Sequence, residues 1–101
     1  MEINGGVKME FKLAERGPKH FAFEYEQEGK MLAEIEWIQR ENVMDMNHTF
    51  VSDELRGQGV AKKLLDQAAE YARENNYKMR AICSYVVAAF ERSAEYDDVK
   101  A

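Results

Sequence analysis

The chain has 101 residues, of which 46% are hydrophobic and 33% charged, a composition typical of one globular domain spanning residues 1–101. The net charge of −5 argues against nucleic acid as a partner, and no apolar run approaches the roughly 18 residues that a membrane span needs. Cys83 is the single cysteine, which excludes an internal disulfide. The residues after Met1 lack a signal-peptide pattern, so we expect a cytoplasmic protein.

Alternating apolar and polar residues predict four strands in the first half of the chain, at residues 7–13, 20–27, 31–38 and 44–51. Turn residues at 15–18 and 28–30 separate the first three strands, and these short links favour an antiparallel meander. The third strand would place Glu34 and Glu36 on one face. The fourth would place four side chains on one face: Met44, Met46, His48 and Phe50.

Helical spacing predicts one long helix from Gln58 to Asn75, whose apolar stripe consists of Val60, Ala61, Leu64, Leu65, Ala68, Tyr71 and Ala72. Asn75 and Asn76 are a suitable stop, because Asn tolerates the left-handed conformation. A fifth strand from Tyr77 to Cys83 follows, and Ser84 would cap a short helix from Tyr85 to Arg92. The long crossover favours a parallel pairing of the fourth and fifth strands. We therefore predict an α+β fold with a mixed sheet of about five strands, one long helix and one short helix.

A glycine-containing loop separates the fourth strand from the long helix, with Gly57 and Gly59 one residue apart. The amides at a helix N-terminus lack intrahelical partners and carry partial positive charge, so they bind anions, phosphates above all. A P-loop would need Gly-Lys-Ser/Thr, and a dinucleotide loop would need a third glycine where Lys62 stands. The alternative is a glycine turn that merely begins a helix.

The run Arg56-Gly57-Gln58-Gly59-Val60-Ala61 resembles the Q/R-x-x-G-x-G/A signature of the GNAT superfamily of acetyl-CoA-dependent N-acetyltransferases. The resemblance covers roughly residues 44–90. It implies that the amides of this run hold the pyrophosphate of coenzyme A, and that the fourth and fifth strands splay apart beside the cofactor. It also implies that the main-chain N–H of Phe50 or Val51 polarises the thioester. Gly17-Pro18 stands where full-size members have one or two helices, so the acceptor side would be unusually open.

Three cations cluster at the loop, namely Arg56, Lys62 and Lys63. They would attract a negatively charged cofactor, and we include Lys62 among the cofactor-binding residues. The alternative is that Lys62 and Lys63 are ordinary solvated positions of the helix.

Two residues are candidates for catalysis. Cys83 ends the fifth strand, where the resemblance implies that it faces the acyl group, and a thiolate there could accept the acetyl group itself. The alternative is a small buried hydrophobe. His48 is the candidate base, acting on an amine through water or activating Cys83 from the neighbouring strand. The alternative is a packed strand histidine, and His20 is expected at the surface.

Phe90 stands where many members have the tyrosine that protonates the leaving thiolate, with Tyr85 and Tyr96 as possible substitutes. Glu34 and Glu36 could bind a cationic acceptor or form a solvated face, and no cluster has metal-ligand spacing. These features predict an N-acetyltransferase acting on an unidentified amine, possibly through Cys83. The alternatives are a non-catalytic or self-acetylating acyl-CoA-binding module, and a small interaction domain. The acceptor and the oligomeric state stay open.

Overall fold

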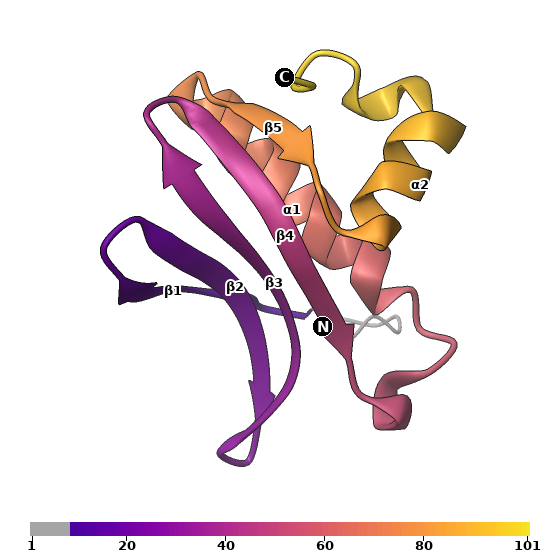
Figure 1. The fold of residues 1–101 in the computed structure, drawn as a ribbon. Helices are drawn as coiled ribbons and strands as arrows, with labels where there is room; N and C mark the ends of the chain where they lie inside the picture. The colour runs from indigo at the N-terminus through magenta and orange to yellow at the C-terminus, as the bar shows by residue number, and fades with distance from the viewer. Residues whose placement is uncertain (1–8) are drawn as a thin grey trace, which may run out of the picture.

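The computed structural model describes residues 9–101. The elements in chain order are β1 (Lys12–Gly17), β2 (His20–Gln27), β3 (Lys30–Arg40), β4 (Val43–Val51), η1 (Asp53–Leu55), α1 (Val60–Asn75), β5 (Lys78–Ala81), α2 (Ser84–Arg92) and η2 (Ala94–Tyr96). The strands form one sheet in the order β1-β2-β3-β4-β5, antiparallel from β1 to β4 and parallel between β4 and β5. The predicted α+β architecture is confirmed (Figure 1).

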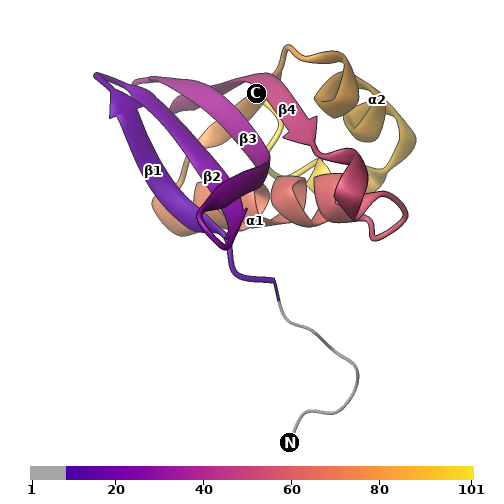
Figure 2. The same cartoon turned by 90° about the horizontal axis from the view of Figure 1, so that it is seen from below.

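Helix α1 lies along one face of the sheet, as two perpendicular views show (Figures 1 and 2). Among the described residues, no helix lies over the opposite face of β1 to β3. No helix in residues 9–101 is long and apolar enough to cross a membrane. The fold therefore presents one covered face and one open face, and the two differ in chemistry.

The first strand differs from its prediction. Residues 9–11 are not in a strand, and positions 7 and 8 of the predicted range lie outside the described residues. The strand instead continues to Gly17, through most of the predicted turn, because Glu15 still pairs with Phe21 and the chain reverses only at Pro18 and Lys19. The register shifts between Glu15 and Gly17, which marks a β-bulge at Arg16.

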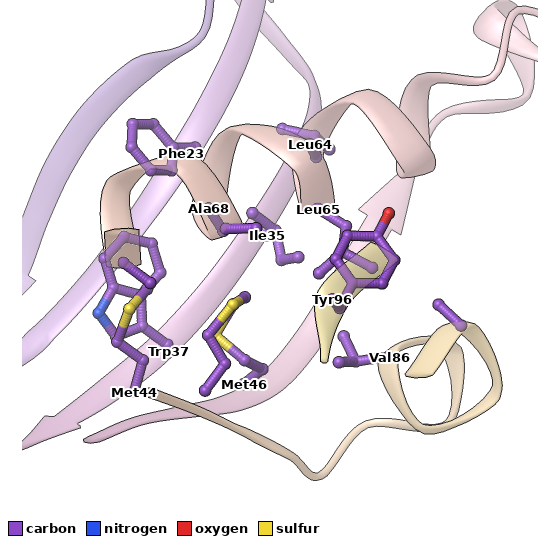
Figure 3. Packing of buried hydrophobic residues seen from close by; sticks show 14 of the residues in the cluster. Phe23, Ile35, Trp37, Met44, Met46, Leu64, Leu65, Ala68, Val86 and Tyr96 are labelled. Atoms are coloured by element: carbon purple, nitrogen blue, oxygen red, sulfur yellow. The ribbon is translucent and has the colours of Figure 1, made fainter. Parts of the chain in front are cut away.

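The core lies between α1 and the sheet (Figure 3). Trp37 is fully buried at its centre, with ring centroids 5.9 Å from Phe21, 5.5 Å from Phe23 and 5.5 Å from Tyr71. The apolar side of α1 supplies the other half of the core, through Val60, Leu64, Leu65, Ala68, Ala69 and Ala72. Full burial of each leucine side chain contributes about 1.5–3 kcal/mol. The helical pattern in the sequence therefore identified the correct face of α1.

Both ends of α1 follow from local chemistry. The helix begins at Val60, two residues later than predicted, because Gly59 adopts the left-handed conformation with φ 67°. It ends at Asn75, as predicted, and Asn76 takes φ 60° and donates its N–H to the Ala72 and Arg73 carbonyls.

The C-terminal segment, residues 94–101, lies against the sheet beyond the last predicted helix. Met79 donates its N–H to the Val99 carbonyl at 2.6 Å and accepts from the Ala101 N–H at 2.8 Å. Tyr96 and Val99 are buried, and Arg73 forms an ion pair of 2.7 Å with Asp98. The segment thus covers part of the outer edge of β5, which is shorter than its predicted range from Tyr77 to Cys83.

Candidate functional site

The loop before α1 presents main-chain amides that the fold itself does not use. Within the loop, Arg56 donates its N–H to Asp53 and Gln58 donates to Leu55, and the first amide of α1 with an internal acceptor is that of Lys63. No acceptor within residues 9–101 is found for five amides, those of Gly57, Gly59, Val60, Ala61 and Lys62. Donors at a helix N-terminus with the dipole behind them form an anion site.

The backbone conformation of the loop favours glycine at positions 57 and 59. Gly57 has φ 83° and Gly59 has φ 67°, values that other L-residues reach only with strain. A Cβ atom built on either residue meets nothing within 4 Å. The space beside the loop is therefore open to a ligand.

The cations at the loop differ in their availability. Arg56 is exposed and forms an ion pair of 2.9 Å with Asp53. Lys62 Nζ lies 2.9 Å from Asp66 and 3.2 Å from Glu95, and the hydrogen bond with Asp66 is the main reason why the pKa of Lys62 lies above its ordinary value. Lys62 is therefore engaged with carboxylates, and an anion would have to compete for it.

Two pockets flank the first turn of α1. One, of about 210 Å³, is lined by Lys62, Tyr85, Ala89, Arg92, Ser93, Glu95 and Tyr96. The other, of about 320 Å³, lies on the side of β2 and is lined by Met9, Tyr25, Gln27, Glu54, Leu55, Gln58 and Lys63. The first combines two cationic side chains with an apolar floor, whereas the second is mostly polar.

Strands β4 and β5 part in the middle of β4. Their parallel pairing ends at Met46 and Ala81, and the Met46 carbonyl accepts from both Ile82 and Cys83 at 3.1 and 2.9 Å. Beyond Met46, β4 continues while the chain after β5 turns away into α2 (Figure 1). Residues 48–51 of β4 therefore have strand partners on the β3 side only, as the predicted splay requires.

A bulge at Asn47 changes the face on which β4 displays its last residues. Trp37 pairs with Met46 but Glu36 pairs with His48, so Asn47 has no partner of its own. The prediction of one common face for Met44, Met46, His48 and Phe50 was therefore wrong. The two methionines point into the core, whereas His48 and Phe50 lie on the open face with Glu34 and Glu36.

The main chain of the parted segment offers donors toward its open edge. Ser52 donates its N–H to the Leu32 carbonyl of β3 at 2.7 Å. Because the polar groups of successive residues alternate between the two edges of a strand, those of Phe50 also point toward β3. By the same alternation, the N–H groups of Thr49 and Val51 point toward the open edge. Of the two predicted oxyanion donors, Val51 is thus the one that fits.

Cys83 lies where the two strands part. It is half-buried and is the residue immediately before α2, which begins at Ser84, one residue earlier than predicted. Its Sγ lies 3.4 Å from the hydroxyl of Thr49 across the point of divergence. Thr49 pairs with Ile35, on the covered face. Cys83 thus contacts a residue of the covered face, whereas His48 lies on the open face, and activation of Cys83 by His48, one of its two predicted roles, stays a prediction.

Phe90 and the two tyrosines suggested as substitute acids, Tyr85 and Tyr96, have different surroundings. Phe90 is buried and packs on Tyr96, with centroids 5.4 Å apart. The Tyr96 hydroxyl donates to Asp66 at 2.6 Å, and burial together with this contact raises the pKa of Tyr96. Burial also raises the pKa of Tyr85, which lines the pocket beside Lys62. Both tyrosines are thus protonated at neutral pH, and both line the pocket beside Lys62.

A cluster of charged side chains occupies the open face; we refer to it as the carboxylate face, defined by Arg16, His20, Glu24, Glu34, Glu36 and His48. Arg16 lies 2.6 Å from Glu24, 2.5 Å from Glu34 and 3.0 Å from Glu36. The two histidines add contacts, His20 with Glu36 at 2.7 Å and His48 with Glu34 at 3.4 Å. His20 keeps 34% of its side-chain surface exposed, so it lies at the surface as expected, and there it is paired with Glu36.

The carboxylate face also contains the one group of possible metal ligands found in the described residues, Glu34, Glu36 and His48, whose ligand atoms lie within 4.8 Å of one another. Sequence spacing predicted no such group. The residues come from two strands and meet only because the bulge at Asn47 turns His48 to this side.

Comparisons with known proteins agree with this geometry. A family model described as "GCN5-related N-acetyl-transferase" matches residues 20–99. The solution structure of a GCN5-like candidate N-acetyltransferase from Staphylococcus aureus is 41% identical, with a TM-score of 0.69, over 92% of this chain and 88% of that one. No curated protein matches significantly.

More distant solved structures share the fold. The ribosomal-protein-S18-alanine N-acetyltransferase from Escherichia coli is 20% identical, with a TM-score of 0.61, over 75% of this chain and 52% of that one. An aminoglycoside acetyltransferase from an uncultured soil metagenomic sample is 16% identical, with a TM-score of 0.60, over 79% of this chain and 59% of that one. This chain therefore spans little more than half the length of these two proteins.

Proposed function

Because this chain belongs to the GCN5-related N-acetyltransferase family, we propose that it binds acetyl-CoA at the loop before α1 and transfers the acetyl group to an amine. The observation that carries the proposal is the set of amides from Gly57 to Lys62 that have no acceptor within the described residues. Open space beside both glycines allows a diphosphate to approach them closely. The residues present thus fit the group that the family uses.

The loop would hold the cofactor through its main chain. The amides of Gly59, Val60 and Ala61 donate to the pyrophosphate, and the dipole of α1 adds favourable charge. Arg56 is free to turn from Asp53, an exposed ion pair of small value, toward a phosphate. Lys62 and Arg92 line a pocket suited to a further anionic group of the same ligand.

The parted strands would position the acyl group. Acetyl-CoA supplies an activated thioester, and an extended arm can run along the open edge of β4. There the Val51 N–H donates to the carbonyl oxygen and stabilises the negative charge that develops on it. The exposed Phe50 and Ile82 provide apolar contacts on β4 and after β5. Phe50 would therefore bind the cofactor through its side chain.

His48 is the base of the direct route. Its side chain is about half exposed on the carboxylate face, two residues before Phe50. It removes a proton from the amine through water as the nitrogen attacks the thioester carbonyl. The carbon–sulfur bond then breaks, and the thiolate leaves with a proton from solvent or from Tyr85.

A second route passes through Cys83 and is favoured by its place beside Thr49 and by Phe90 at the position of the usual acid. The Cys83 thiolate attacks the thioester, and a new thioester on Cys83 replaces the broken bond to coenzyme A. An amine then attacks this acyl-cysteine and restores the thiol. Without an amine the reaction stops at the acylated protein, which is the alternative of a self-acetylating module.

Three measurements test the proposal. Acetyl-CoA should raise the melting temperature, and absence of any shift at millimolar ligand would remove cofactor binding. Release of free thiol with a panel of amines separates an enzyme from a binding module. Intact mass after incubation with acetyl-CoA tests the covalent route. If Cys83→Ala turns over normally and the natural protein never gains an acetyl group, the direct route alone remains.

A further inference from the structure

The ammonium group of Lys62 makes as many hydrogen bonds as it has donors. Its Nζ atom donates to Asp66 Oδ2 at 2.9 Å, to Asp66 Oδ1 at 3.2 Å and to Glu95 Oε1 at 3.2 Å. An ammonium group has three N–H donors and no acceptor. These contacts therefore leave Lys62 no spare donor for an anion that enters the pocket beside the first turn of α1, which Lys62 lines.

The two carboxylates that hold Lys62 differ in their other contacts. Asp66 accepts a hydrogen bond of 2.6 Å from the hydroxyl of the buried Tyr96, so it also fastens the C-terminal segment. It lies one turn further along α1, so the helix itself keeps it near Lys62. Glu95 contributes one longer contact from another element, η2, and it lines the pocket itself. Glu95 is therefore the partner that an anion in this pocket can displace.

Ser93 holds the Glu95 carboxylate in position. The Ser93 hydroxyl accepts the Glu95 N–H at 3.2 Å and donates to Glu95 Oε2 at 3.0 Å. The residue that caps η2 thus binds both the main chain and the side chain of Glu95. The contact between Glu95 and Lys62 therefore follows from the local structure in which the C-terminal segment begins.

The charges around this pocket balance before any ligand binds. Lys62 and Arg92 supply two positive charges to its lining, and Asp66 and Glu95 bring two negative charges to Lys62. A phosphate in the pocket would lie near Glu95 as well as near the cations. The Glu95 carboxylate therefore opposes an anion in two ways, because it occupies Lys62 and because like charges repel.

We propose that Glu95 is an autoinhibitory residue, which holds Lys62 in the free protein and is displaced when a phosphate of the cofactor binds there. This inference rests on the proposed function. Lys62 turns from Glu95 to the phosphate while Asp66 stays in place, so binding breaks one link between α1 and η2. Such coupling is reciprocal, so the link lowers the affinity for the cofactor by the factor by which the cofactor weakens the link. Arg73 still fastens the segment through Asp98, which confines the effect to the surroundings of Glu95.

The first test compares dissociation constants of coenzyme A, measured by isothermal titration calorimetry. Glu95→Gln should tighten binding about threefold, the effect expected of one exposed ion pair. Glu91→Gln, which removes the same charge from an exposed position of α2, should change the constant much less. In a Lys62→Met background, Glu95→Gln should have no larger effect than Glu91→Gln. An equal gain with and without Lys62 would overturn the proposal, as would the absence of any gain.

A second ligand identifies the phosphate that competes with Glu95. Dephospho-coenzyme A lacks the phosphate on the ribose and keeps the diphosphate. If Glu95→Gln tightens the binding of both ligands equally, the diphosphate is the competitor. A gain confined to coenzyme A assigns the competition to the ribose phosphate, and either result supports the proposal.

The last test uses the free protein and so separates this inference from the proposed function. Hydrogen exchange of the Lys62 ammonium protons, followed by NMR, should be slow in the natural protein because all three donors are hydrogen-bonded. Exchange should be faster in Glu95→Gln and unchanged in Glu91→Gln. Absence of coenzyme A binding in every variant would remove the proposed function, whereas an unchanged exchange rate in Glu95→Gln would overturn the hold of Glu95 on Lys62.

Discussion

Replacing the loop glycines with alanine separates conformational strain from ligand contact. Gly57 and Gly59 have positive φ, and so does Gly29 in the hairpin between β2 and β3, with φ 77°. A Cβ atom at any of the three meets nothing within 4 Å of the described chain. The substitutions Gly29→Ala, Gly57→Ala and Gly59→Ala therefore impose similar backbone strain, but only the last two place a methyl group where the diphosphate would lie.

The magnitude follows from the conformation. Holding a non-glycine residue in the left-handed region costs roughly 1–2 kcal/mol. For a domain of this size, each kcal/mol lowers the melting temperature by about 4–8 °C, so all three variants without ligand should melt at lower temperature by a similar amount. Acetyl-CoA at a hundredfold excess over its Kd should stabilise the natural protein by about 2.7 kcal/mol.

The assay is a thermal melt of each variant with and without acetyl-CoA, at one fixed ligand concentration. Gly29→Ala should keep the full rise in melting temperature that the ligand produces in the natural protein. Gly57→Ala and Gly59→Ala should lose most of that rise, because the added methyl group blocks the approach of the phosphate oxygens. If all three variants keep the same rise, the diphosphate does not bind at these amides and the argument for the loop is refuted.

Three further predictions concern stability. Although burial alone would raise it, the hydrogen bond from His20 and the charge of Arg16 hold the pKa of Glu36 below its ordinary value of 4.5. Glu36 therefore stabilises the fold above pH 4.5, and this contribution is lost as the pH falls through its lowered pKa. In Glu36→Gln, the free energy of unfolding in urea should fall less steeply with decreasing pH than in the natural protein, whereas Glu74→Gln, at an exposed position of α1, should keep the natural dependence. Leu64→Ala should cost about 2–5 kcal/mol by urea unfolding, since the side chain is fully buried; a loss below 1 kcal/mol would contradict the packing. Asn76→Ala should cost about 1 kcal/mol and Asn76→Gly nothing, because φ is 60° there, and equal melting temperatures would exclude that strain.

The elements closest to the proposed cofactor site were predictable because local chemistry determines them. The spacing of Leu64, Leu65 and Ala68 marks a helix with one apolar side, and that side is buried. Gly59 and Asn76 occupy the two left-handed positions at its ends, as their residue types allow. Such features depend on neighbours in sequence, so a single chain is enough to predict them.

The carboxylate face was predictable only in part, because it depends on two bulges. Alternation correctly placed Glu34 and Glu36 together, but it placed His48 with the core methionines. The bulge at Asn47 could not be detected from the alternation of polar and apolar residues. From Asn47 to Val51 no residue is fully buried, so neither side of this segment is marked by a row of core residues. Arg16 was assigned to a turn because Gly17 and Pro18, which follow it, suggested a chain reversal. The structure instead has a bulge at Arg16, inside β1.

Asn47 also has a consequence for how this protein can change over evolutionary time. Asn47 is the extra residue of the bulge, so its loss would make Met46 and His48 direct neighbours that point to opposite sides of the sheet, as they already do. The pairing of His48 with Glu36 and of Phe50 with Glu34 would then continue in a regular strand. We infer that β4 tolerates a one-residue deletion at Asn47 better than at its paired positions.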